Sequence, residues 1–92
     1  MNIEQEPKYK IENGKIVNRA DGIAIPDNEP VFIFRAKDIK AGLAIECYSM
    51  MLDEGVHKQV VLERFEDFKR YQQENKSLCG IPDSDESCLK AN

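Results

Sequence analysis

The sequence YKIENGKIV at residues 9–17 decides the fold. Two short runs of alternating apolar and polar residues flank Asn13-Gly14. A two-residue type I′ turn needs a positive φ at both central positions, and Asn and Gly tolerate that conformation best. These residues therefore predict a β-hairpin whose strands span residues 8–12 and 15–18. A second turn is expected at residues 20–22.

A nearly continuous apolar run, Val31–Phe34, follows a loop at residues 25–30 that contains two prolines. Short strands that are apolar on both faces usually lie in the middle of a sheet or at a subunit contact. The run therefore predicts a third strand, which completes a small three-stranded antiparallel sheet. The loop either spaces two strands or acts as a rigid recognition loop.

After Arg35 the spacing of apolar residues changes to steps of three and four. This period predicts a helix that ends near Gly55, with Asp38 placed to cap its first turn. A second amphipathic helix is expected from Val56 to Asn75, packed antiparallel on the first. The predicted fold class is thus α+β, a three-stranded sheet followed by a helical hairpin. The first helix carries two adjoining apolar stripes: Ile39, Leu43, Cys47 and Met50 in one, and Ala44, Tyr48 and Met51 in the other.

Three segments are predicted along the chain. Residues 1–7 are polar, include Pro7 and form a flexible lead-in, while residues 8–75 form a single α+β domain. Residues 76–92 are rich in Gly, Pro, Ser and Asp and show no apolar period. They are expected to form a disordered tail unless a partner binds them.

The composition is that of a small globular protein, with 41% hydrophobic and 33% charged residues among 92 and a formal net charge of −4. Binding to a phosphate backbone needs a basic patch, so direct DNA or RNA binding is not expected. The longest apolar runs fall far short of the roughly 20 residues of a membrane span. The first residues lack the basic start and apolar stretch of a secretory signal, which indicates a cytoplasmic protein.

No catalytic or metal-binding pattern is recognisable. Three cysteines, Cys47, Cys79 and Cys88, are an odd number in a chain without an export signal, so a disulfide framework is not expected. With His57 they would supply four ligands, but no C-x-x-C pair is present and no metal or cofactor is predicted. His57 has no Ser or Cys at triad spacing, and phosphate-cradling glycine motifs are absent. The sequence therefore predicts a non-enzymatic protein.

A candidate anion site lies where charged residues follow the predicted strands. Arg19 follows the hairpin, and Arg35, Lys37 and Asp38 precede the first helix. A helix amino terminus offers free N–H groups and the positive end of the dipole, which suit an anion when Arg is nearby. In the structural alternative, Asp38 satisfies those N–H groups itself, and an arginine pairs with an acidic residue of the neighbouring turn or loop.

A candidate interface lies on the first helix. Tyr48, Met50 and Met51 form an adaptable apolar patch, for which core packing is the alternative use. The apolar residues of this helix cover more of its circumference than one small sheet can bury. A homo-oligomer, most simply a dimer, is therefore expected.

Residues 18–38 resemble a pattern found in small uncharacterised proteins of tailed bacteriophages and prophages, N-R-x-[ST]-G-x-x-I-P-x-D-E-P-V-F-x-x-R-[AG]-[KR]-D followed by two helices. Asp21 replaces the usual Ser or Thr, and Asn28 replaces the usual Asp. The resemblance brings no known activity. It implies a phage accessory protein in the cytoplasm of a bacterial host.

Small phage proteins of this kind often bind host components, including defence proteins and their nucleotide signals. The leading hypothesis is a binding protein that neutralises a host factor, such as an antiviral defence factor, by occupying a host protein. In one alternative, an oligomeric sponge sequesters a small nucleotide signal through Arg19, Arg35 and Lys37. In the other, the chain is a small structural or assembly protein of the virion.

Overall fold

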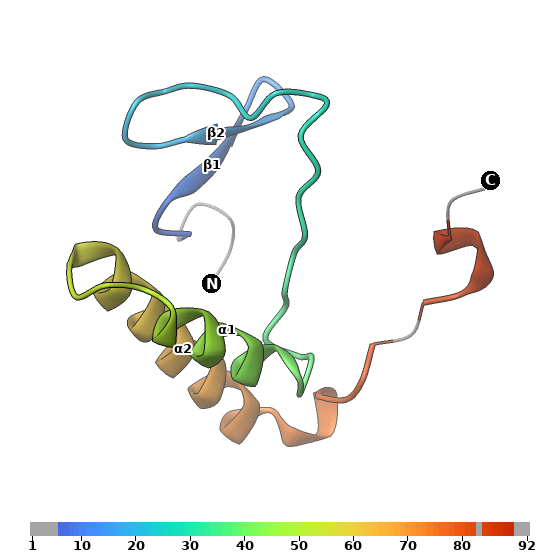
Figure 1. The fold of residues 1–92 in the computed structure, drawn as a ribbon. Helices are drawn as coiled ribbons and strands as arrows, with labels where there is room; N and C mark the ends of the chain where they lie inside the picture. Colours follow the sequence, from blue (N-terminus) through green and yellow to red (C-terminus); the bar gives the residue numbers. More distant parts are fainter. Residues whose placement is uncertain (1–5, 83, 90–92) are drawn as a thin grey trace. The chain divides into compact units, whose positions relative to one another are not determined.

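The computed structural model describes residues 6–82 and 84–89 (Figure 1). Backbone contacts divide the chain into two compact units, of which the first ends at Phe32 and the second begins at Ile33. The predicted division into lead-in, domain and tail stays a prediction. Residues 1–5 of the lead-in and residues 83 and 90–92 of the tail lie outside the described residues.

The first unit is built on the predicted β-hairpin. Strand β1, Tyr9–Glu12, pairs antiparallel with β2, Lys15–Asn18. The two residues of the turn, Asn13 and Gly14, have φ values of 52° and 75°. Both values lie in the left-handed region that the type I′ turn requires, so the local sequence specifies the turn and the register together.

The segment after the second predicted turn lies along the other edge of β2. Asn18 donates its N–H to the carbonyl of Ile23 at 3.0 Å, and Ile25 donates to the carbonyl of Ile16 at 2.8 Å. Gly22 turns the chain with a φ of 73°, and the carboxylate of Asp21 accepts the N–H of Ile23.

The predicted three-stranded sheet is wrong in one respect, because among residues 6–82 and 84–89 the sheet has two strands. Residues Val31–Phe34 adopt no strand within the described chain, and the edge of β2 is already occupied by the residues around Ala24. An apolar run shows a preference for extended backbone but does not name a pairing partner. Here that run connects the two units.

The second unit is the predicted helical hairpin, formed by α1, Ala41–Met50, and α2, Val56–Glu74, side by side in Figure 1. Helix α1 is shorter than predicted at both ends. The carboxylate of Asp38 accepts the N–H of Lys40 at 2.8 Å, in a turn ahead of the helix. Asp38 therefore closes that turn and does not cap the first turn of α1.

The buried residues of α1 are all small. Ala41, Gly42 and Ser49 are buried. A Cβ built on Gly42 would lie 3.8 Å from the Phe65 ring and 4.0 Å from Oε1 of Gln72. Helix α1 therefore approaches α2 through its small residues.

Gln72 of α2 fastens the loop that precedes α1. Its amide Nε2 donates to the carbonyls of Ala36 and Asp38, both at 3.0 Å. After α2, a short 3-10 helix η2, Lys76–Leu78, brings Gly80 beside the same loop. Gly80 donates to the carbonyl of Lys37 at 2.9 Å and accepts the N–H of Ile39 at 3.1 Å. Consecutive carbonyls of the loop, at residues 36–38, thus all have partners.

A second 3-10 helix, η3, spans Glu86–Cys88 within the predicted tail. The Asp85 carboxylate accepts hydrogen bonds from the hydroxyl and the N–H of Ser87. These bonds favour the charged form and hold the pKa of Asp85 below its usual value.

We expect Gly42→Ala to raise the free energy of unfolding by up to about 1 kcal/mol, because Ala favours the helix and its Cβ would make ordinary contact with Phe65. The same substitution at Gly14, where φ is 75°, should lower it by about 1 kcal/mol. Urea denaturation of both variants checks the opposite signs, and a destabilising Gly42→Ala would contradict the packing described.

We expect Gln72→Glu to lower the free energy of unfolding by about 2 kcal/mol, since it leaves the Ala36 carbonyl without a donor and places a carboxylate against the carbonyls of Ala36 and Asp38. Gln73→Glu makes the same chemical change at the exposed neighbouring position and should stay within about 0.5 kcal/mol of the parent. Equal melting temperatures for the two variants would show that the Gln72 amide does not hold the loop.

Candidate functional site

Three of the four residues predicted to bind an anion share the loop that Gln72 fastens. Arg35 and Lys37 are exposed, and Asp38 is half-buried. The carbonyl of Arg35 accepts the N–H of Asp38 at 3.0 Å, which closes a turn. Arg19 belongs to the first unit and is not part of this loop.

The backbone donors ahead of α1 are already engaged by acceptors of the chain itself. The N–H of Ile39 donates to Gly80, that of Lys40 to the Asp38 carboxylate, and that of Ala41 to the Asp38 carbonyl. An anion at this position would have to displace the Asp38 carboxylate. The geometry therefore favours the structural alternative for Asp38.

Arg19 holds the chain ahead of the hairpin. Its Nε donates to the carbonyl of Glu6 at 2.9 Å, and its backbone N–H donates to the carbonyl of Lys8 at 2.9 Å. These bonds extend the hairpin by one step beyond β1. The position of Arg19 is explained by this structural role.

The predicted interface residues all lie at the surface. Met50 and Met51 are 72% and 76% exposed, and Tyr48 is also exposed. The Tyr48 hydroxyl lies 3.1 Å from Nε2 of His57, and the two rings meet edge to face. This contact links the end of α1 to the first turn of α2. His57 is thus engaged with Tyr48.

The exposed patch is larger than the sequence indicated. Leu43, predicted in the same stripe as Cys47 and Met50, is 63% exposed, and Cys47 is exposed as well. We call Leu43, Cys47, Met50 and Met51 the outer face of α1. The spacing of apolar residues groups these residues on the helix, but it does not indicate whether they face the solvent or the interior. The small residues on the opposite side were the signal for close helix packing.

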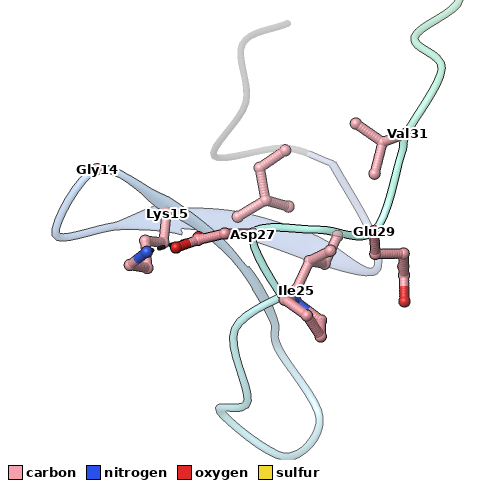
Figure 2. A pocket seen from close by; sticks show the side chains of 8 residues that line it. Gly14, Lys15, Ile25, Asp27, Glu29 and Val31 are labelled. Carbon is pink, nitrogen blue, oxygen red and sulfur yellow. Dashed lines mark hydrogen bonds and ion pairs between the residues drawn. The ribbon is translucent and has the colours of Figure 1, made fainter.

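A shallow hollow of about 200 Å³ lies in the first unit, between β2 and the loop that follows Ile25 (Figure 2). Lys15 and Asp27 face each other across it at 2.8 Å, in an exposed ion pair of the kind that contributes little to stability. Small-molecule pockets usually enclose about 300–1,000 Å³. The hollow is therefore smaller than a usual ligand pocket, which favours a loop that spaces two segments over a loop that recognises a ligand.

Metal-binding geometry is missing from the part of the chain that the structure describes. In residues 6–82 and 84–89, no group of three or more His, Cys, Asp and Glu side chains is arranged to hold a metal ion. All three cysteines are free thiols. No helix of the same residues has the length and apolar character needed to cross a membrane.

Comparisons of the chain with protein-family models, with curated proteins and with solved structures gave no match.

Proposed function

We propose that this chain is a non-enzymatic accessory binding protein of a bacteriophage or prophage, which neutralises a host factor by binding a host protein. The outer face of α1 is the observation that carries the proposal. On the opposite side of the helix Ala41 and Gly42 are buried, and Gly42 lies close to Phe65 of α2. The outer face would bury its apolar side chains against a partner.

Exposed apolar side chains in such a group favour association, because water is released from them when a second surface covers them. Leu43, Met50 and Met51 stand at helical spacing, so one partner surface can cover them together. Two adjacent methionines suit a partner of irregular shape because the thioether side chain is flexible and polarizable. The outer face fits a hydrophobic groove or helix on another protein.

A protein partner agrees better with the charges than a membrane or a nucleic acid does. Helix α1 contains no Lys or Arg, whereas helices that lie on membranes usually carry a basic polar face. The formal net charge of −4 disfavours contact with phosphate backbones. The phage assignment rests on the resemblance of residues 18–38, and neutralisation by occupancy is proposed because the sequence carries no recognisable catalytic pattern.

The nucleotide sponge and the virion protein remain alternatives. The sponge requires free donors ahead of α1, where the N–H groups of residues 39–41 already have acceptors. A virion protein would also use the outer face, but against phage proteins. Capture of a specific protein from uninfected bacteria supports neutralisation, while association with phage proteins alone supports assembly.

We expect Leu43→Glu to abolish capture of the protein partner by the immobilised chain, because it places a charge within the apolar outer face. Leu78→Glu is the matched control: Leu78 is 62% exposed, against 63% for Leu43, but lies in η2. Both variants should stay within about 0.5 kcal/mol of the parent in stability, since neither side chain is buried. Equal capture by Leu43→Glu and Leu78→Glu would refute the outer face as the binding surface.

We expect Arg35→Ala to leave the melting temperature of the monomeric chain nearly unchanged, because the side chain is exposed and makes no hydrogen bond or ion pair among the described residues. Mass spectrometry of small molecules released by heating the parent tests the sponge directly. A released nucleotide that Arg35→Ala no longer retains would favour the sponge over a protein partner.

A further inference from the structure

Strand β1 forms the outer edge of the hairpin, on the other side from the edge of β2 that residues 23–25 occupy. The N–H of Arg19 donates to the carbonyl of Lys8, which fixes the residues of this ladder that exchange backbone hydrogen bonds. Since bonded residues alternate along an antiparallel ladder, Lys10 and Glu12 face β2 in the same way as Lys8. The N–H and C=O of Ile11 therefore point away from β2.

The backbone of Ile11 can pair with a further strand at this edge. Among residues 6–82 and 84–89, no hydrogen bond outside the hairpin involves Ile11, and the residue is 47% exposed. Tyr9 also directs its backbone outward, but the Glu6 carboxylate already accepts its N–H. A strand added here can therefore exchange a complete pair of backbone bonds with Ile11 but not with Tyr9.

The charged side chains of β1 are complementary to a second copy of the same strand. With Ile11 on a two-fold axis, the two copies of Ile11 form a hydrogen-bonded antiparallel pair. Lys10 of each copy then faces Glu12 of the other copy. Within one chain Lys10 and Glu12 already form an ion pair at 3.4 Å. The dimer would thus bring together four charges of alternating sign.

The same arrangement extends an apolar row across the sheet. Ile11 faces Ile16 within the hairpin, and Ile25 donates its N–H to Ile16 at the far edge of β2. Opposing residues of neighbouring strands share one face of a sheet, so these isoleucines of both copies would form one continuous row. Two short strands are only marginally stable by themselves, whereas four strands with a shared apolar face are more stable.

A register that places Lys10 on the axis is disfavoured in two ways. It pairs Lys8 with Glu12, but it also sets Lys10 of one copy against Lys10 of the other. It further requires a bond from the Tyr9 N–H to the added strand, although the Glu6 carboxylate already holds that donor. Such a dimer would lack backbone bonds and contain a repulsive pair.

The neighbouring registers on either side set like charges against each other. Tyr9 on the axis would place Lys8 of each copy opposite Lys10 of the other, and Glu12 on the axis would place two glutamates together. The backbone donors and the charges therefore agree on the register centred on Ile11.

We propose that β1 pairs antiparallel with β1 of a second copy of this chain, with Ile11 on the two-fold axis, so that the protein is a symmetric dimer. The two hairpins then form one four-stranded sheet. This interface shares no residue with the outer face of α1, so it can be tested independently of the proposed function.

Sedimentation equilibrium of charge-reversed chains tests the interface. The parent should dimerise, and Lys10→Glu or Glu12→Lys alone should each raise the dimer dissociation constant by about tenfold or more, because two attractive pairs become repulsive. An equimolar mixture of these two variants should form a heterodimer, since every facing pair is then attractive. Lys8→Glu is the matched control, because Lys8 is an exposed residue of the same row that would face Gly14, and this variant should dimerise like the parent.

A parent that stays monomeric would overturn the proposal. So would a dimer that neither Lys10→Glu nor Glu12→Lys weakens, or a mixture that shows no preference for the heterodimer. A dimer weakened by Lys8→Glu but not by Lys10→Glu would overturn the register. Because none of these side chains is buried, the variants are expected to fold, and circular dichroism checks it.

Disulfide cross-linking tests the register separately, in a chain whose three cysteines are replaced by Ser. Residues 10 and 12 of opposite copies would form a non-hydrogen-bonded pair with Cα atoms about 4.5 Å apart, within the range of a disulfide. A mixture of Lys10→Cys and Glu12→Cys chains should therefore cross-link into a heterodimer under mild oxidation. Lys10→Cys alone, whose counterpart would lie diagonally at about 7–8 Å, should cross-link far more slowly. Cross-linking of Lys10→Cys alone that is as fast as that of the mixture would contradict the register.

Discussion

The amide of Gln72 is the interaction on which the helical unit depends. It donates to the carbonyls of Ala36 and Asp38, while Gly80 pairs with the residues on either side of Asp38. Buried or half-buried carbonyls are costly without a donor, so these contacts determine where the loop ends and where α1 begins. The position of α1 then decides which of its faces meets α2. The outer face is exposed because the small residues occupy the contact.

The sequence predicted those elements whose determinants are local. Asn13-Gly14 specifies the hairpin turn through backbone conformation, and the periodic apolar residues of α2 specify its length within one residue of the predicted end. The third strand could not be decided in this way, because strand pairing depends on a partner distant in sequence. For the same reason the bonds of Gln72 to a loop more than thirty residues away were not foreseen.

The candidate site shows the same difference between features that local sequence determines and features that depend on contacts distant in sequence. Arg35, Lys37 and Asp38 share one loop because they are neighbours in sequence, whereas the bond between Arg19 and the Glu6 carbonyl depends on how the hairpin extends. Leu43 and Cys47 were predicted in one apolar stripe, but apolar spacing does not indicate whether a stripe faces the interior or the solvent, and both residues are exposed. Because these side chains are exposed, we favour a protein partner at the outer face of α1 over an anion at the loop that precedes this helix.

The solvent exposure of the methionine methyl groups in the isolated protein tests this account most directly. Paramagnetic relaxation by a soluble gadolinium agent can be measured at the methyl groups of Met50 and Met51, with the buried methyl of Ala41 as the internal reference. The account predicts strong relaxation at both methionines and weak relaxation at Ala41. Methionine methyl groups shielded as well as that of Ala41 would mean that the chain already covers the outer face of α1, and would contradict a binding surface there.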